Sequence, residues 1–333
     1  MSSVLKGLKL IAANSALRSF RGSVLLELAR DAKAGYAMRA GRLQSRSGMA
    51  HAEENLDASL RYIEEVFGDY KSVGGIDEFA GRAAELGPGD NYGVALLLRS
   101  SGCRQVDLVD RFHARRNPAY QALIYAELAR RHPPVAALLE GVDLNDDRSF
   151  PGVRVFDGPA AAAERFFTNE RGYDFILSRA VLEHLYDPEL ALGHMVSALK
   201  PGGMLLHKVD LRDHRLFSTR YHELKWLEPA VFLHRRMTRN RGRPNRVLIH
   251  RYRAALDALG LDYELLVTSL AGVGEIVPHV PYSAIDQRRR DAAEAFVREN
   301  RRRFSTDLRG VADDDLAVTG FFMVARSQGA KVP

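Results

Sequence analysis

The sequence predicts an α/β fold: a doubly wound, seven-stranded and mainly parallel sheet, with a helical N-terminal cap and an insertion after the fifth strand. Short apolar runs typical of buried strands alternate with helical segments between residues 81 and 210. Such alternation is typical of a parallel sheet that helices cover on both faces. A chain of 333 residues, 46% of them hydrophobic, is long enough to bury one sizeable core and a second lobe.

Residues 1–75 are predicted to form the cap, and residues 76–333 the main domain. In the cap, apolar residues recur near the helical period at Leu56, Leu60, Ile63 and Phe67. The N-terminus lacks the uninterrupted apolar run and the cleavage site of a signal peptide, and no apolar stretch approaches the length of a transmembrane helix. We therefore expect a cytoplasmic protein. Its basic N-terminal segment is predicted to pack as a cap, with contact to a membrane surface as the less favoured alternative.

Five strand-like runs follow in chain order: GRAAEL from Gly81, QVDLVD from Gln105, GVRVFDG from Gly152, YDFILS from Tyr173 and GGMLLHKVD from Gly202. The helix before the fifth run is well marked, because Asp187 is a suitable N-cap and Pro188 suits the first turn. An additional helical insert, NPAYQALIYAELARRHPPVAALLEG, separates the second and third runs.

The pattern changes after the fifth run. Residues from about 211 to 253 are polar, basic and irregular, and we interpret them as a substrate lid. A helix, the strand-like run DYELLVTSL, a charged helix and a last strand-like run, LAVTGFFMVAR, complete the chain. The single cysteine, Cys103, excludes an intrachain disulfide framework and a cysteine-based zinc cluster.

A glycine-containing loop, AELGPGDNYG, joins the first strand to the next helix. Gly87 and Gly89 allow the backbone to approach a ligand that a Cβ atom would exclude. In a parallel sheet this loop lies at the carboxyl edge of the strands, where nucleotides bind. Asp110 ends the second strand 23 residues after Gly87, where its carboxylate can accept hydrogen bonds from both hydroxyls of a ribose.

Two classes of cofactor use this arrangement. The dinucleotide fingerprint G-x-G-x-x-G requires a third glycine at the position of Tyr92. Glu85 would repel a pyrophosphate, whereas it would attract the sulfonium and ammonium groups of S-adenosylmethionine. The residues therefore favour S-adenosylmethionine, and an NAD(P)-dependent oxidoreductase is the enzymatic alternative.

With these motifs the chain resembles the class I S-adenosylmethionine-dependent methyltransferases, from about Gly81 to Asp210 and in its last two strands. AELGPGDNYG resembles the first motif of that family, and VFDGPAAAAERFF resembles the turn after its third strand. The resemblance implies that the two last strand-like runs form an antiparallel pair, and that Asp157 faces the adenine amino group. It also implies the full set of cofactor-binding residues: Glu85, Gly87, Pro88, Gly89, Asp110, Arg111, Asp157, Gly158 and Ser178.

Polar residues that could act on a methyl acceptor follow the fourth and fifth strands. His184 comes after the fourth strand, and His207, Asp210, Asp213 and His214 lie at or beyond the end of the fifth. A histidine or aspartate at this edge can remove the proton of a hydroxyl. We predict His184 and His214 as alternative bases and Asp213 as an orienting partner or weak base. Some of these side chains could bind a divalent cation instead, but we expect no metal ion.

The lid contains eight arginines and no acid in residues 234–253. A clamp for an anionic or polyhydroxylated substrate and a solvated loop with internal salt bridges both remain open. Nucleic acid is a disfavoured partner, despite a net charge of +6, because aromatic residues are sparse among the basic ones. The resemblance extends to bacterial methyltransferases of surface glycans or secondary metabolites. It therefore implies a sugar hydroxyl as the leading acceptor, followed by a small or lipid-linked molecule. A methyltransferase-like binding protein without turnover is the non-catalytic alternative.

Overall fold

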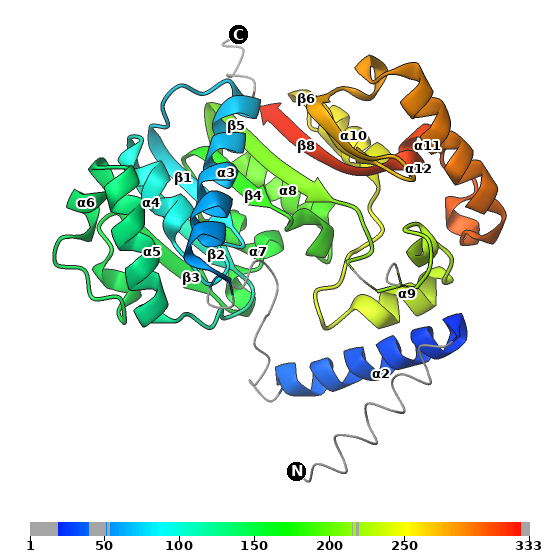
Figure 1. The fold of residues 1–333 in the computed structure, drawn as a ribbon, viewed down its shortest axis with the longest axis horizontal. Coiled ribbons are helices and arrows are strands. Elements are labelled where there is room, and N and C mark those ends of the chain that lie inside the picture. The colour runs from blue at the N-terminus through cyan, green and yellow to red at the C-terminus, as the bar shows by residue number, and fades with distance from the viewer. Residues whose placement is uncertain (1–18, 40–50, 52–53, 215, 218–219, 328–333) are drawn as a thin grey trace.

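The computed structural model describes residues 19–39, 51, 54–214, 216–217 and 220–327, and a single sheet runs through it (Figure 1). The sheet has eight strands in the order β3-β2-β1-β4-β5-β8-β6-β7. The prediction of a doubly wound, mainly parallel α/β sheet is confirmed. The predicted number of seven strands is wrong, because β7 (Gly274–Val280) adds an edge strand that pairs with β6.

Strands β1 to β5 run parallel to one another and coincide with the five predicted runs: β1 (Gly81–Leu86), β2 (Cys103–Asp110), β3 (Val153–Asp157), β4 (Tyr173–Arg179) and β5 (Leu199–Asp210). The predicted antiparallel pair is confirmed, since β8 (Val318–Arg326) lies antiparallel between β5 and β6 (Asp262–Leu270). The strand order reverses between β1 and β4. The loops after these two strands therefore diverge, which opens a crevice at the carboxyl edge.

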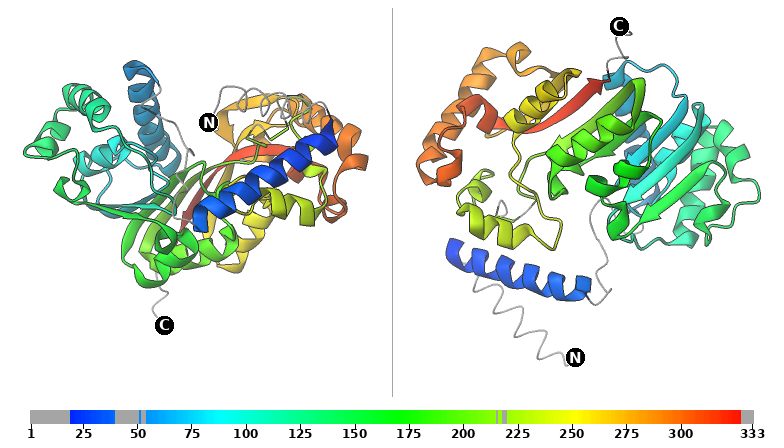
Figure 2. Two further views of the ribbon diagram at one scale, coloured as in Figure 1. Left: turned by 90° about the horizontal axis from the view of Figure 1, so that it is seen from below. Right: turned by 180° about the vertical axis from the view of Figure 1, so that it is seen from behind.

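Helices cover the two faces of the sheet (Figure 2). One face carries α3 (Leu56–Gly74), α4 (Gly93–Ser100), α5 (Pro118–Arg131) and α6 (Pro134–Leu139). The other carries α7 (Ala163–Asn169), α8 (Pro188–Ala198) and α10 (Ile249–Ala258). Each layer buries its own apolar cluster against the sheet. Helices α11 (Gln287–Asn300) and α12 (Asp313–Ala317) lie beside the end of the sheet that β6 and β7 form (Figure 1). Short 3₁₀ helices in the connections include η2 (Asp147–Ser149), η3 (Pro159–Ala161), η6 (Tyr282–Ala284), η7 (Arg301–Arg303) and η8 (Thr306–Leu308).

Helix starts follow the local sequence. The carboxylate of Asp187 accepts a hydrogen bond from the Leu190 amide at 2.9 Å, so the predicted cap of α8 is confirmed. On α3 the predicted apolar face is also confirmed: Leu60 and Ile63 are buried, with Leu56 and Phe67 packed against the same cluster.

Among the described residues, the two helices of the predicted cap lie apart. Helix α3 belongs to the layer on the sheet, whereas α2 (Phe20–Arg39) packs along α9 (Val231–Thr238) of the lid (Figure 1). Buried Asp31 fixes this contact, because its carboxylate accepts hydrogen bonds from the amides of Asn240 at 2.8 Å and Arg241 at 3.1 Å. Residues 1–18, on which most of the predicted membrane contact rests, lie outside the described residues. Among the described helices, none combines the length and apolarity needed to span a bilayer.

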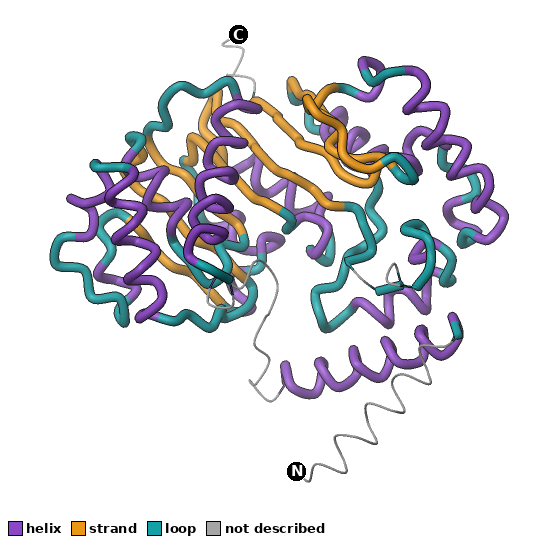
Figure 3. Tube along the Cα trace, in the orientation of Figure 1, coloured by secondary structure: helices purple, strands orange, loops and turns teal. Residues whose placement is uncertain are grey.

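The lid follows β5 and is mostly loop before α9 and α10, with one short 3₁₀ helix, η5 (Lys225–Leu227) (Figure 3). Trp226 is buried in it and joins the apolar cluster beneath α10. Most of its described arginines bind protein groups: Arg243 donates to the carbonyl of His214 and Arg246 to that of Trp226. The described part of the lid is therefore packed onto the domain through internal contacts of its arginines, in place of the solvated loop of the second interpretation, and the clamp for a substrate stays a prediction.

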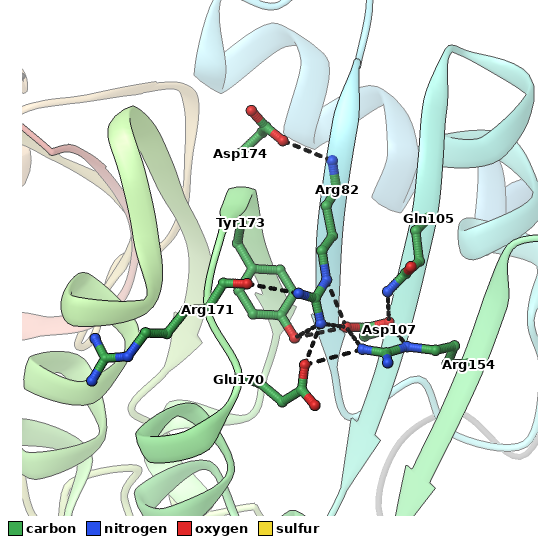
Figure 4. Close-up of polar contacts among 8 residues, drawn as sticks. All are labelled: Arg82, Gln105, Asp107, Arg154, Glu170, Arg171, Tyr173 and Asp174. Carbon is green, nitrogen blue, oxygen red and sulfur yellow. Dashed lines mark hydrogen bonds and ion pairs between the residues drawn. The ribbon is translucent and has the colours of Figure 1, made fainter.

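The amino-terminal half of the sheet contains a buried polar network centred on Asp107 of β2 (Figure 4). Its carboxylate accepts hydrogen bonds from Arg82 at 2.6 Å, from Arg154 at 2.8 and 2.9 Å, from Tyr173 at 2.7 Å and from Gln105 at 2.8 Å. Burial alone would raise the pKa of Asp107, but these donors outweigh it and lower the pKa. The network ties the starts of β1, β3 and β4 to β2.

Candidate functional site

A cleft of about 760 Å³, open to solvent, lies at the carboxyl edge between the loops after β1, β2 and β4. We call it the main cleft. Its lining includes Gly87, Pro88 and Gly89 after β1, and Asp110 and Arg111 at the end of β2. A smaller space of about 360 Å³, the inner recess, adjoins it and is lined by residues of α3, β1 and α4. The strand-order reversal thus produces a concave site where the sequence predicted one.

The loop after β1 requires glycine. Gly87 has a φ of +65°, and a Cβ atom there would lie 2.6 Å from Cγ2 of Val181. Gly89 has a φ of +70°. Residues other than glycine rarely adopt a backbone conformation with positive φ. The glycines therefore keep the backbone close to the floor of the main cleft, as predicted from the sequence.

Glu85 lines the inner recess and is 6% exposed. Its Oε2 atom has no hydrogen-bond partner within the described residues. Burial raises the pKa of Glu85 to about 8. Tyr62 and Asn91 line the same recess. A buried carboxyl group without a partner is expensive unless a ligand completes it, and a cationic ligand would restore its charged form.

Asp110 is the last residue of β2 and faces the main cleft. Its Oδ1 atom accepts a hydrogen bond from the Phe112 amide at 2.8 Å, which fixes the carboxylate at the strand end. Burial raises the pKa of Asp110 to about 6, and the Phe112 amide and the neighbouring Arg111 guanidinium offset part of this shift. Arg111 also donates to the carbonyl of His184 at 3.1 Å, so it joins the β2 end to the segment after β4.

Three predicted cofactor residues lie apart from the lining of the main cleft. Asp157 is half-exposed and its carboxylate meets the His113 ring at 2.6 Å. Gly158 follows it with a φ of +90°. The Ser178 side chain is fully buried and hydrogen-bonds to Nδ1 of His207 at 2.7 Å inside the sheet. The hydroxyl of Ser178 is therefore engaged with His207. Of β4, only the last residue, Arg179, lines the main cleft.

The two predicted bases meet on the side of the main cleft after β4. His184 ends the short 3₁₀ helix η4 (Leu182–His184) and lines the cleft. The rings of His184 and His214 lie edge to face with centroids 4.7 Å apart. Burial, and then the adjacent His214 ring, lower the pKa of His184 to about 3. Burial also lowers the pKa of His214, with the Asp210 carboxylate opposing it. Both rings are therefore neutral near pH 7.

The backbone around the histidines is held by the lid. His214 has a φ of +47°, which is uncommon for a residue other than glycine. Its carbonyl accepts from Arg243 at 3.0 Å. Asn245 holds η4, because its side-chain amide donates to the carbonyls of Leu182 and Leu185 at 2.9 and 3.0 Å. The asparagine and arginine of the lid thus position both rings.

Asp213, the predicted orienting partner, is 1% exposed and its carboxylate accepts a hydrogen bond from the Phe217 amide at 2.7 Å. It does not line the main cleft. This placement suits a residue that shapes the turn before His214, and neither Asp213 nor His214 is part of the cleft lining.

The sequence interpretation missed Glu183, which is fully buried beside the histidines. Burial, and then the nearby Asp210 carboxylate, raise the pKa of Glu183 well above its ordinary value. A signal was present, since Glu183 is the one acid in the apolar run from Val181 to Leu185. His51 also lines the main cleft without having been singled out.

The chain is similar to one protein family and to several solved structures. A family model described as "Methyltransferase domain" matches residues 60–266. No curated protein matches the chain. Among solved structures, the chain is similar to the Haemonchus contortus phosphoethanolamine N-methyltransferase 2 in complex with S-adenosyl-L-methionine, with 15% identity, 80% of this chain and 52% of that chain covered, and a TM-score of 0.41.

Two further solved structures are similar over most of the chain. The YcgJ protein of Bacillus subtilis is 14% identical, with 80% of this chain and 100% of that chain covered and a TM-score of 0.41. The CurJ carbon methyltransferase is 12% identical, with 95% of this chain and 70% of that chain covered and a TM-score of 0.40.

Proposed function

The chain belongs to the class I S-adenosylmethionine-dependent methyltransferases, because the methyltransferase-domain family model matches more than half of it, and we propose that it methylates a hydroxyl group. The favoured acceptor is a hydroxyl of a sugar or glycan, or of a related small molecule. S-adenosylmethionine is the methyl donor of this family. When bound, it supplies a methyl group on a positively charged sulfur, which a nucleophile can accept.

The residues of the two cavities suit this cofactor. The unpartnered Oε2 of Glu85 in the inner recess suits an ammonium group, for which an ionised carboxylate is the strongest acceptor. Gly87 leaves room that a Cβ atom would fill, and Asp110 presents a carboxylate to the main cleft where a ribose diol would bind. Glu85, Gly87, Pro88, Gly89, Asp110 and Arg111 are the residues we propose to hold it. Asp157, Gly158 and Ser178 remain proposals from the family resemblance.

The observation that carries the acceptor proposal is that His184 lines the same cleft as Gly87 and Asp110 and that its ring contacts the ring of His214. A neutral imidazole at this place can accept the proton of a hydroxyl. His214 is the better candidate, because its Nε2 atom lies 3.7 Å from the Asp210 carboxylate, which favours the protonated form of the ring. His184, with a pKa of about 3, is the weaker base.

The test is a methyl-transfer assay with labelled S-adenosylmethionine and a panel of glycosides, simple alcohols and amines. His214→Asn should lower kcat by about 10²–10⁴-fold and leave the cofactor Kd within a few-fold of wild type. Asparagine tolerates the backbone conformation of His214. The matched control is His222→Gln in the same lid, since His222 pairs with Glu228 instead of facing the cleft. Transfer to amines alone would refute the hydroxyl proposal, unchanged kcat in His214→Asn would refute His214 as the base, and the absence of any turnover would favour a binding protein.

A further inference from the structure

Three possible metal ligands converge beside the main cleft. One ligand atom each of Glu183, His184 and His214 lies within 4.8 Å of the other two. Two of these residues belong to η4 after β4, and the third follows β5, so the cluster bridges adjacent strand ends. From the sequence we expected no metal ion, and the acids that could have served as ligands were Asp210 and Asp213 near the end of β5.

Glu183 is a buried carboxyl group that lacks a cation. It is 0% exposed, and neither carboxylate oxygen has a hydrogen-bond partner of good geometry within the described residues. Arg212 of the lid, a cation whose charge acts on Glu183, donates two side-chain hydrogen bonds to Asp210, at 2.8 and 2.6 Å. Nδ1 of His184 is likewise buried without a partner. Such groups carry a full desolvation penalty unless a further partner binds them.

The neighbouring contacts preorganise the cluster. The left-handed turn at His214, held by Arg243, directs the ring toward His184, and Asn245 fixes η4 from the other side. Arg243 and Asn245 act on the backbone, whereas Nε2 of His214 lies 3.3 Å from the carbonyl oxygen of Asp210, a contact that an ion would replace. A site whose supporting shell is fixed while its inner polar atoms are unpaired is typical of a binding site for a missing ligand.

We propose that Glu183, His184 and His214 bind one divalent first-row transition-metal ion at the acceptor side of the main cleft. One carboxylate with two imidazoles suits Mn²⁺, Fe²⁺, Co²⁺ or Zn²⁺ better than Mg²⁺ or Ca²⁺, which prefer oxygen ligands. Ligand bonds of about 2.1 Å place two ligands of one ion at most about 4.2 Å apart. Tetrahedral geometry would bring two ligands to about 3.4 Å, so pairs that now lie within 4.8 Å would close by up to about 1.4 Å.

Three protein ligands leave coordination positions open toward the cleft. An acceptor hydroxyl at an open position loses its proton more readily: the O–H bond breaks, the oxygen keeps the electron pair, and the proton passes to water. This role rests on the proposed function, because it requires a hydroxyl acceptor, and it takes the place of the histidine base, because a ring nitrogen that binds the ion cannot also accept the proton. The binding of the ion does not rest on the proposed function, since it follows from the three side chains alone.

The experiment is a titration of the full, chelator-treated chain with Co²⁺, followed by visible absorption, and with Mn²⁺, followed by electron paramagnetic resonance. Mg²⁺ serves as the competing ion. We expect one Co²⁺ per chain, poor competition by Mg²⁺, and a loss of affinity of at least about 100-fold in Glu183→Gln and in His214→Asn. His222→Gln, outside the cluster, should bind Co²⁺ as wild type does. Cofactor binding in the same preparations reports that each variant is folded.

The outcomes separate the two proposals. No bound ion, or unchanged Co²⁺ affinity in both folded cluster variants, would overturn the metal site and leave methyl transfer by a histidine base intact. A bound ion that gives a cobalt spectrum typical of imidazole ligands supports the site. If that loaded protein methylates only amines, the site stands and the hydroxyl acceptor is refuted.

Discussion

Two buried carboxyl groups of one domain differ in their hydrogen-bond partners. Asp107, in the middle of β2, and Glu183, in η4 beyond the carboxyl edge of the sheet, are both 0% exposed. Asp107 accepts hydrogen bonds from four side chains, and these lower its pKa (Figure 4). Glu183 has no well-formed partner, and its pKa is raised well above the ordinary value.

The difference teaches that partners, and not burial, separate a structural polar cluster from a functional one. A buried polar network in which every group has a hydrogen-bond partner makes the fold more rigid. A buried polar group without a partner lowers the stability of the folded state until a ligand binds it. Glu85, which is buried, and His184, which is partly buried, follow the pattern of Glu183, because each has a buried atom at the carboxyl edge without a partner among the described residues. The two edges should therefore respond differently to substitution.

The largest expected effect is on folding. Asp107→Ala should lower the free energy of unfolding by about 3–5 kcal/mol, because it leaves Arg82 and Arg154 without their buried partner. Glu183→Gln should change it by less than about 1 kcal/mol in chelator-containing buffer, because the carboxyl group it replaces is held neutral by burial. Urea unfolding at pH 7 measures both. If the free energy of unfolding fell equally in the two variants, the distinction between a carboxyl group with partners and one without would be wrong.

The next effect is on cofactor affinity. Asp110→Ala should weaken S-adenosylmethionine binding by about 1.5–3 kcal/mol, since hydrogen bonds to an ionised acceptor are lost. Asp174→Ala is the matched control at the other edge, where that carboxylate accepts from the Arg82 amide at 2.7 Å and from Lys200 at 2.6 Å. Its cofactor affinity should match wild type. A folded Asp110→Ala chain with undiminished affinity would mean that the ribose binds elsewhere.

The smallest effect is a pH dependence of stability. The pKa of Glu85 is raised from 4.5 to about 8, so between these pH values the folded state holds a proton that the unfolded state has released. Stability contributed by this group is therefore lost as pH rises through the window. Glu85→Gln should remove a slope of at most about 1.4 kcal/mol per pH unit, or about 1–2 kcal/mol between pH 6 and 8. Parallel stability curves for the two chains would contradict the raised pKa.

Much of the fold could be predicted because β1 to β5 are buried runs with clear boundaries. Strand β7 could not, because it lies at the sheet edge with Val277 exposed and Ile276 as its one buried residue. It therefore carries neither an apolar run nor a clean alternation. The docking of α2 also escaped prediction, since Asp31 meets Asn240 across more than 200 residues and no local pattern encodes that contact.

The candidate site divides in the same way. Gly87, Gly89 and Asp110 could be predicted because their roles follow from local backbone needs and from position at a strand end. Ser178 and Asp213 could be placed near the edge, but the direction of each side chain depends on distant partners, His207 and the Phe217 amide. Glu183 was missed because a pattern of residue types does not reveal which buried acid lacks a partner.

Calorimetry with the purified chain tests the central claim most directly, namely that the unpartnered polar groups of the carboxyl edge form a site for S-adenosylmethionine. Wild type should bind S-adenosylmethionine or S-adenosylhomocysteine with a Kd of about 1 μM, roughly −8 kcal/mol, and should give no binding heat with NAD or NADP. Glu85→Gln should weaken the first interaction, whereas Gln105→Ala, at the satisfied network, should not. Binding of NAD or NADP in preference to S-adenosylmethionine would contradict the account.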